Sequence, residues 1–368
     1  MKIVIIGIRG IPSNYGGFET CVEELSKRLS VKYEVIVYAR SQYYKYDKLA
    51  YYNGCKIVYL PTIKLKFIDT LFHTSISIFH ALIFYKKSYW FIFNAANSPA
   101  LLLPALLRQK MALNTDGLEW KRDKWGSIGK LYYQFAEWLS TKLVNDIITD
   151  SKGMHNYYKK RWKKKSSIIE YGAYIQKSKN CTVINKYGLG KDNYFLQITR
   201  LEPENNPLLT IEAFIHFKDN NPDSMLKLVI VGDVSYQSEY SKKIKITKRE
   251  DIIFTGFEYD KKILCELRTN CFAYIHGNQV GGTNPALLEA MGAGVFIIAR
   301  DVNFNREVLG NGGLFFMRNK LDLCKKMEWV LKNKNTRKEY IEKSLEKVEK
   351  YYNWDRITSE YEKLAKGK

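Results

Sequence analysis

The chain has 368 residues, enough for two domains of ordinary size, and its 46% hydrophobic content excludes a disordered or low-complexity protein. Its six cysteines form no CxxC pair or metal-ligand spacing, which excludes a cysteine-based metal centre and favours a reducing compartment. The formal charge of +21 divides into +16 over residues 1–185 and +5 over residues 186–368, so the basic first half predicts an anionic partner or a solvated basic face.

The N-terminal segment predicts a buried strand followed by a glycine-rich loop. Residues 2–6 are a continuous apolar run, typical of a parallel sheet covered on both faces and too short for a signal peptide. A helix is expected over residues 18–30, with Gly16 and Gly17 at its start, where unpaired N–H groups favour an anion. Arg9 is the cation in this loop best suited to a phosphate. The glycine spacing does not fit a dinucleotide fingerprint.

Residues 68–85, IDTLFHTSISIFHALIFY, form an apolar stretch of helix length flanked by lysines. Such a segment fits a helix that lies on a membrane surface, and it equally fits a helix of the protein core. No run in the sequence reaches the roughly 18 apolar residues expected of a membrane-spanning helix.

The segment DGLEWKR follows a strand expected over residues 111–113. Its Asp116 and Glu119 therefore stand at the carboxyl end of a strand, where ligand-binding residues of α/β sheets collect. A carboxylate at Asp116 could accept the proton of an acceptor hydroxyl. Capping of a helix is the alternative role for an aspartate at this position.

Alternating strand and helix patterns continue to about residue 170 and begin again at residue 194, with a polar stretch over residues 176–185 between them that reads as a linker. The alternation predicts an α/β protein with two doubly wound parallel sheets. We expect an N-terminal domain over residues 1–180, a second domain over residues 181–350 and a terminal helix over residues 351–368.

The second domain carries the most informative segment, YIHGNQVGGTNPALLEAMGAGVFIIAR, over residues 274–300. The pattern is strand, loop, helix and strand. Gly281, Gly282, Thr283 and Asn284 stand where the helix starts, so a phosphate or sugar nucleotide is the expected ligand. An ordinary βαβ unit with a tight turn is the alternative. Glu289 lies within the helix.

These segments resemble the retaining, nucleotide-sugar-dependent glycosyltransferases of the GT-B fold (glycosyltransferase family 4 type). Glu289 matches the second Glu of the family's Glu-x7-Glu pattern, which binds the nucleotide ribose, and Gly281 stands at the position of the first. Arg200 matches the arginine of the family's Arg-x4-Lys pattern, whose cations contact the donor diphosphate, and Asn205 replaces the lysine.

The runs GIRGIPSNYGGFET, DGLEWKR and HGNQVGGTNPALLEAM resemble a narrower branch, the rhamnosyltransferases of bacterial capsule and cell-wall polysaccharides with a DUF1972-type N-terminal domain. The resemblance implies two Rossmann-like domains facing across a cleft and a terminal helix that crosses back to the first domain. It also implies transfer of L-rhamnose from dTDP-L-rhamnose, with retention, to a lipid-diphosphate-linked saccharide. The enzyme would then be cytoplasmic and peripheral on the anionic inner face of the cell membrane.

The resemblance assigns roles to individual residues, and it implies a reaction that needs no metal and no cofactor besides the donor. Catalytic roles fall to Asp116 and Arg200. Contacts with the acceptor fall to Glu19, Glu119 and Arg122. The donor-binding set is Arg9, Gly16, Gly17, Arg200, Asn205, Gly281, Gly282, Thr283, Asn284 and Glu289.

Three other functions remain open from the sequence. One is a retaining hexosyltransferase that uses a UDP-sugar, and another is a nucleotide-sugar epimerase of the same fold, which would need no acceptor. A nucleic-acid-binding protein is disfavoured, because no recognised binding motif is present and acidic residues interrupt the positive segments.

Overall fold

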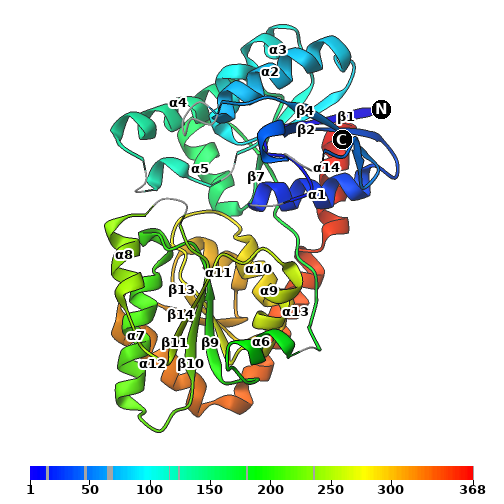
Figure 1. The fold of residues 1–368 in the computed structure, drawn as a ribbon. Helices are drawn as coiled ribbons and strands as arrows, with labels where there is room; N and C mark the ends of the chain where they lie inside the picture. The colour runs from blue at the N-terminus through cyan, green and yellow to red at the C-terminus, as the bar shows by residue number, and fades with distance from the viewer. Residues whose placement is uncertain are drawn as a thin grey trace. The chain divides into compact units, whose positions relative to one another are not determined.

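The computed structural model describes residues 1–13, 16–44, 48–63, 69–115, 117–122, 125–179, 181–234 and 237–367. The chain divides into two compact units (Figure 1). The first unit contains Met1–Tyr171 and Trp354–Lys368, and the second contains Gly172–Asn353. The chain therefore passes from one unit to the other at 171/172 and at 353/354, whereas the sequence predicts these boundaries at 180/181 and 350/351.

The first unit is built on a mainly parallel sheet. Its strands are β1 (Lys2–Ile6), β2 (Glu34–Arg40), β3 (Tyr51–Tyr52), β4 (Cys55–Leu60), β5 (Tyr89–Phe93), β6 (Met111–Asn114), β7 (Asp146–Thr149) and β8 (Ser167–Ile168). Their order in space is β3-β4-β2-β1-β5-β6-β7-β8, and β3 pairs with β4 in the antiparallel sense. The buried positions of the central strands are mostly apolar because helices cover both faces of the sheet.

Helices connect these strands. They are α1 (Gly17–Leu29), α2 (Asp69–Phe84), α3 (Leu102–Leu106), α4 (Ser127–Leu143), α5 (Lys152–Trp162) and α14 (Trp354–Ala365), with 3-10 turns η1 (Ser41–Tyr43), η2 (Ala95–Leu101) and η3 (Glu119–Lys121). The terminal helix α14 packs beside α1 and buries Tyr361, whose hydroxyl accepts a 2.7 Å hydrogen bond from the amide of Asn114. The predicted return of the last helix to the first domain is confirmed.

The second unit holds a parallel sheet with the strand order β11-β10-β9-β12-β13-β14. Its strands are β9 (Tyr194–Ile198), β10 (Lys227–Val231), β11 (Ile252–Gly256), β12 (Ala273–His276), β13 (Ile297–Arg300) and β14 (Gly313–Phe316). Its helices are α6 (Thr182–Lys186), α7 (Pro207–Asn220), α8 (Glu239–Ile246), α9 (Lys261–Asn270), α10 (Pro285–Gly292), α11 (Asn303–Leu309), α12 (Lys320–Lys332) and α13 (Arg337–Tyr351), with turns η4 (Pro203–Asn205) and η5 (Lys334–Thr336).

Two sequence expectations about local structure are wrong. The sequence also predicts a helix over residues 99–107. The structure has a 3-10 turn followed by the short α3 there, because Pro104 has no N–H to bond a carbonyl in the preceding turn of a continuous helix. The stretch predicted as a linker ends in α6, whose first amides, those of Val183 and Ile184, donate to the Glu266 carboxylate at 2.5 and 3.2 Å. That part of the stretch is a packed element of the second unit.

A buried carboxylate on α4 makes the stability of the first unit dependent on pH. Burial raises the pKa of Glu137 to about 7, and the Tyr157 hydroxyl donates to its Oε2 at 2.8 Å. The folded state therefore holds this proton more tightly than the unfolded chain, whose carboxyl has its ordinary pKa of 4.5. The stabilisation of the folded state by this bound proton is fully present below pH 4.5 and is lost as the pH rises to about 7.

We expect Glu137→Gln to abolish this dependence. A shift of this size corresponds to about 3 kcal/mol between the two protonation states. Urea denaturation at pH 5 and pH 8 measures the effect, with the wild type losing more stability than the variant over that interval. Equal pH dependence in the two proteins would contradict the assignment.

Candidate functional site

The second unit has a topological switch point between β9 and β12. The chain runs from β9 outward to β10 and β11 in one direction, and from β12 outward to β13 and β14 in the other. Loops at the carboxyl ends of strands flanking such a point diverge and leave a crevice for a ligand. Arg200 follows β9, and residues 281–284 follow β12, so the structure brings the two predicted donor loops to the same crevice.

Hydrogen bonds hold these two loops together. The Asn206 side chain donates to the carbonyl oxygen of Gly277 at 2.8 Å, and the Gln279 N–H donates to the carbonyl oxygen of Glu204 at 3.0 Å. The chains approach so closely at Gly277 that a Cβ there would lie 2.2 Å from the carbonyl oxygen of Asn205. These contacts thus hold the two loops side by side, and a side chain at position 277 would push the loops apart.

Arg200 presents an accessible cation at the carboxyl end of β9. Its side chain is 37% exposed, and its guanidinium lies 3.4 Å from the Glu202 carboxylate. Asn205, in contrast, is buried, and its amide donates to the carbonyl oxygen of Arg200 at 3.0 Å. Asn205 therefore shapes the loop that carries Arg200, and its predicted contact with a donor stays a prediction.

Asn284 is the N-cap of α10 and so lies at the helix start that the sequence predicts. Its side chain accepts a 3.0 Å hydrogen bond from the Ala286 N–H, and Pro285 has no N–H to offer. The helix thus supplies its own cap. An anion at this helix start would have to contact the loop amides of Gly281, Gly282 and Thr283, which remain the predicted phosphate contacts.

Glu289 lies on α10 and is held by a residue that the sequence analysis missed. The guanidinium of Arg268, on α9, forms an ion pair with its Oε2. The Arg268 side chain is only 7% exposed, whereas that of Glu289 is 42% exposed. The buried arginine therefore fixes the position of an accessible carboxylate. The signal available in the sequence was the position of Arg268 within a predicted helix, because a charged side chain that is buried there needs a partner.

His276 ends β12 at the floor of the crevice. It is 1% exposed, and burial lowers its pKa to about 3, because the charged imidazole would lose its hydration. The ring is therefore neutral at physiological pH. It brings no positive charge to a phosphate, which leaves that role to Arg200 and the loop amides.

The first unit places Arg9, Gly16, Gly17 and Glu19 in and after the loop at the carboxyl end of β1. The Glu19 carboxylate, in the first turn of α1, accepts a 3.0 Å hydrogen bond from the Arg9 N–H. Burial raises the pKa of Glu19. Because this carboxyl group already occupies the helix start beside Gly16 and Gly17, a phosphate there would meet a competing anion. The predicted phosphate contacts of these two glycines stay a prediction.

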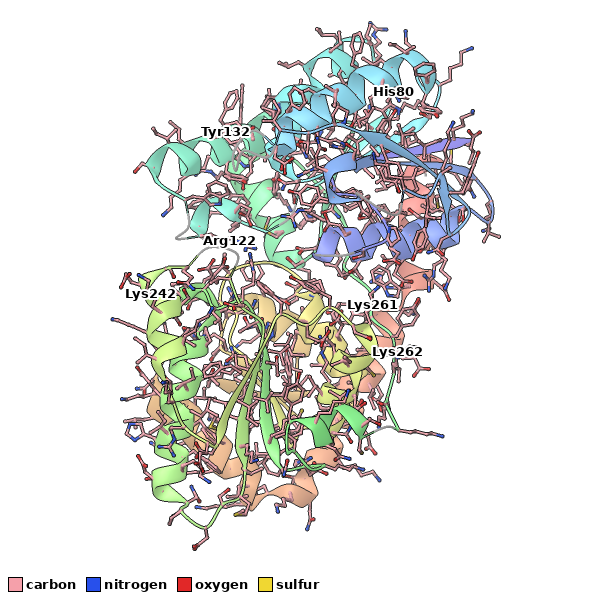
Figure 2. The ribbon with its side chains drawn as sticks, viewed as in Figure 1. His80, Arg122, Tyr132, Lys242, Lys261 and Lys262 are labelled. Carbon is pink, nitrogen blue, oxygen red and sulfur yellow. The ribbon has the colours of Figure 1, made fainter. Side chains whose placement is uncertain are left out.

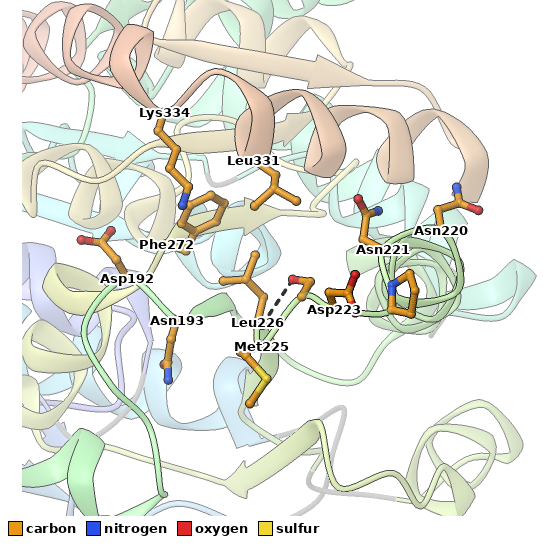
Figure 3. A pocket seen from close by; sticks show the side chains of 12 residues that line it. Asp192, Asn193, Asn220, Asn221, Asp223, Met225, Leu226, Phe272, Leu331 and Lys334 are labelled. Atoms are coloured by element: carbon orange, nitrogen blue, oxygen red, sulfur yellow. Dashed lines mark hydrogen bonds between the residues drawn. The ribbon is translucent and has the colours of Figure 1, made fainter.

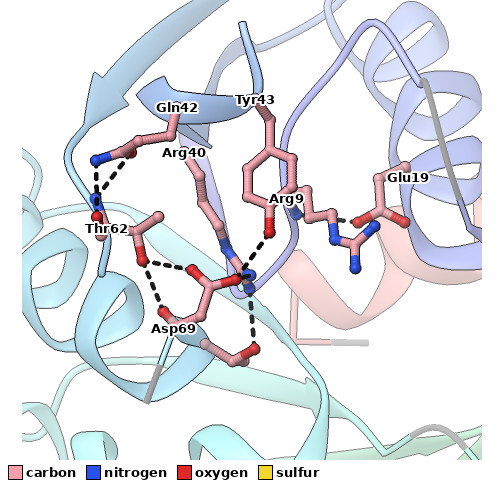
Figure 4. Close-up of polar contacts among 8 residues, drawn as sticks. Arg9, Glu19, Arg40, Gln42, Tyr43, Thr62 and Asp69 are labelled. Atoms are coloured by element: carbon pink, nitrogen blue, oxygen red, sulfur yellow. Dashed lines mark hydrogen bonds and ion pairs between the residues drawn. The ribbon is translucent and has the colours of Figure 1, made fainter. Parts of the chain in front are cut away.

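Arg9 also belongs to a polar network that the sequence did not reveal (Figure 4). Its guanidinium lies 5.2 Å from the centre of the Tyr43 ring, and the Tyr43 hydroxyl donates to Asp69 at 3.1 Å. Asp69 forms a buried 2.7 Å ion pair with Arg40 and accepts from Thr62 at 2.5 Å. The network ties the loop after β1 to the start of α2, which gives Arg9 a defined position.

The predicted acceptor residues Glu119 and Arg122 are partners of each other. The Arg122 Nε lies 2.7 Å from the Glu119 Oε1, and the Trp125 indole donates to Oε2 at 3.0 Å. Arg122 is labelled in Figure 2. Asp116, the proposed base, lies outside the described residues, so its role stays a prediction.

A hollow of the second unit lies away from the predicted site (Figure 3). It has a volume of about 550 Å³ and is lined by residues that precede the strands, including Asn193, Leu226 and Phe272. Ligands of open α/β sheets bind at the opposite, carboxyl ends. In the described part of the chain, no three His, Cys, Asp or Glu side chains gather as they would around a metal ion.

Two family models match the chain. The family described as "Glycosyl transferases group 1" matches residues 182–347, and "Domain of unknown function (DUF1972)" matches residues 1–87 and 104–174. The first match contains both loops of the crevice, together with Arg268 and Glu289. The second contains the loop after β1 and the Glu119–Arg122 pair.

Solved structures share the fold over the whole length. HepE from Anabaena, solved with UDP, is 15% identical over 100% of both chains with a TM-score of 0.75. Sucrose-phosphate synthase from Thermosynechococcus elongatus is 15% identical over 100% of this chain and 98% of its own, with a TM-score of 0.81. An α,α-trehalose-phosphate synthase from Burkholderia xenovorans is 8% identical over 100% of both chains, with a TM-score of 0.76. The chain therefore has the GT-B fold, and its two parts match the DUF1972 and the group 1 glycosyltransferase family models.

Proposed function

We propose that the chain is a glycosyltransferase that takes its sugar from a nucleotide-sugar donor bound at the β9–β12 crevice. The observation that carries the proposal is the convergence of Arg200, the loop 281–284 and Glu289 on one switch point within a group 1 glycosyltransferase domain. HepE, with the same fold, was solved with UDP-glucose.

The proposed reaction depends on position and charge more than on a protein nucleophile. Arg200 and the loop amides would stabilise the negative charge that develops on the departing diphosphate. Glu289 would hold the ribose, and Asp116 with the Glu119–Arg122 pair would face the acceptor hydroxyl. Because Arg200 and the amides carry the charge, the proposal includes no metal and no cofactor besides the donor.

For the donor we propose dTDP-L-rhamnose, transferred with retention to a lipid-linked saccharide of a bacterial surface polysaccharide. The supporting observation is the resemblance of three long runs to polysaccharide rhamnosyltransferases, including Gly281 at the position where the broader family has a sugar-binding Glu. The enzyme would act in the cytoplasm at the inner face of the membrane, which agrees with its basic first half.

A second donor class is favoured by a specific observation. The HepE structures contain UDP and UDP-glucose, so transfer of a hexose from a UDP-sugar is the alternative. A nucleotide-sugar epimerase of the same fold would use the same crevice and would need no acceptor. If the protein released free nucleotide but neither transferred nor inverted the sugar, that result would exclude neither donor.

Calorimetric titration with dTDP-rhamnose, UDP-glucose, UDP-N-acetylglucosamine, GDP-mannose and a short DNA duplex tests the proposal. Tightest binding of dTDP-rhamnose, unchanged by EDTA, is the expected result. Preference for a UDP-sugar would keep the class and replace the donor, whereas binding of DNA alone would contradict the proposal.

A further inference from the structure

One side of the first unit exposes an apolar stripe on α4. Ile128, Leu131, Phe135 and Trp138 follow one another at spacings of three, four and three residues, which places them on one face of the helix. Their exposed fractions are 86%, 70%, 48% and 40%. The Phe135 and Trp138 rings lie 5.9 Å apart, centre to centre, so the stripe is continuous at its C-terminal end.

Two neighbouring helices expose apolar side chains as well. On α2, the buried positions include Ser77, Ile78 and Ala81, which face the core. The exposed large apolar residues of α2 and of α3 with the residue after it are Phe79, Ile83, Phe84, Leu102, Leu103, Leu106 and Leu107. Isolated exposed leucines are ordinary on protein surfaces, but three adjacent elements that share this property form a patch.

The three helices lie on the same side of the sheet (Figure 1). The chain passes from β4 to β5, β6 and β7 in one direction across the sheet, and right-handed crossovers place the connections on one face. The turn η2 packs against both α2 and α4, and the Tyr132 hydroxyl of α4 donates to the Ala96 carbonyl of η2 at 2.7 Å. Figure 2 labels Tyr132 on α4 and His80 on α2.

The charge around this patch is positive. Residues 69–165 contain 16 Lys and Arg against 7 Asp and Glu, and three of the acids, Glu119, Glu137 and Asp150, are buried. The basic end of α5 adjoins α4, because Arg161 donates to Gln134 at 2.9 Å. The exposed basic residues on these elements and directly after them are Lys86, Lys87, Arg108, Lys110, Lys142, Lys152, Lys159, Lys160, Arg161, Lys163 and Lys165.

We propose that the exposed faces of α2, α3 and α4 form a membrane-docking surface for an anionic lipid bilayer. Exposed aromatic and aliphatic side chains enter the interface between headgroups and acyl chains, and the surrounding lysines and arginines attract anionic headgroups. A second copy of the chain would bring the same excess of positive charge to this face, which disfavours self-association. This inference rests on the proposed function in one respect only, the lipid-linked acceptor that would bring the enzyme to a membrane.

The proposed surface combines the two interpretations of the apolar stretch at residues 68–85, a core helix and a helix that lies on a membrane. The helix buries one face in the core, and its other face is apolar and exposed. None of the helices in the described ranges is long and apolar enough to cross a bilayer. The docking surface is therefore an interfacial one.

Co-sedimentation with vesicles of phosphatidylethanolamine and phosphatidylglycerol tests the surface on the full chain. We expect binding to these vesicles, little binding to phosphatidylcholine vesicles, and weaker binding as salt is raised. The double variant Leu106→Glu and Leu131→Glu should lower the vesicle affinity by about tenfold or more, because both side chains would otherwise be buried among lipids. Ile246→Glu, at a 73% exposed position on α8 of the second unit, is the matched control.

Wild-type vesicle affinity in the double variant would overturn the proposal, as would an equal loss in Ile246→Glu. If the wild type formed a dimer that the double variant could not form, and if the wild type did not bind vesicles, the proposal would be overturned in favour of self-association. Titration with the nucleotide sugars separates this result from the proposed function. The double variant should keep wild-type donor affinity, and loss of vesicle binding alone leaves the glycosyltransferase proposal standing.

Discussion

Replacing Arg200 with alanine is expected to weaken the binding of dTDP by about 10- to 100-fold, the range for a lost hydrogen bond to a charged group. The guanidinium is the accessible cation at the switch point, and the nearby His276 is neutral because burial lowers its pKa to about 3. The effect should be confined to ligands with a diphosphate. Calorimetric titration with dTDP and with thymidine measures it.

Arg249→Ala is the matched control for this substitution. Arg249 is 36% exposed and pairs with Asp251 at 2.9 Å, much as Arg200 is 37% exposed and lies near Glu202. It precedes β11, however, and so lies at the opposite edge of the sheet. An equal loss of dTDP affinity in both variants would show that general charge, and not the crevice, governs binding.

Replacing Glu289 with alanine is expected to weaken nucleotide binding by about tenfold, through the lost hydrogen bond to the ribose. The contact can be isolated with a ligand that lacks the hydroxyl. The wild type should bind dTDP more tightly than its 3′-deoxy analogue, and this difference should disappear in Glu289→Ala. An undiminished difference would contradict the assignment of Glu289 to the ribose.

Arg268 acts in this account as a positioning residue. It holds Oε2 of Glu289, which leaves Oε1 as the oxygen assigned to the ribose. Arg268→Ala should therefore lower dTDP affinity less than Glu289→Ala, and adding it to Glu289→Ala should lower that affinity no further. Arg268→Lys should restore part of the loss. Thermal unfolding of each variant separates this effect from instability, because removing one partner of a partly buried ion pair also destabilises the fold.

The fold was largely predictable because its strands are buried on both faces. Runs such as residues 3–6 and 228–231 are apolar without interruption, and α9 begins after Asp260, which caps the Lys262 N–H at 2.7 Å. The turn η2 was not predictable as such, because its irregular backbone depends on packing against α2 and α4.

The candidate site was predictable only in part. Arg200 and Glu289 were found because their sequence spacing resembles a known pattern, and the strand order then brings their loops together. The pairing of Arg268 with Glu289 joins two helices, and the use of the Asn205 amide within its own loop depends on local backbone geometry. Neither contact leaves a periodic signal in the sequence.

A crystal structure of the protein with dTDP tests the central claim most directly. The account predicts the nucleotide at the carboxyl ends of β9 and β12, with the diphosphate against Arg200 and the amides of residues 281–284 and with the ribose on Glu289. A nucleotide bound elsewhere, for example in the hollow beside Phe272, would contradict it.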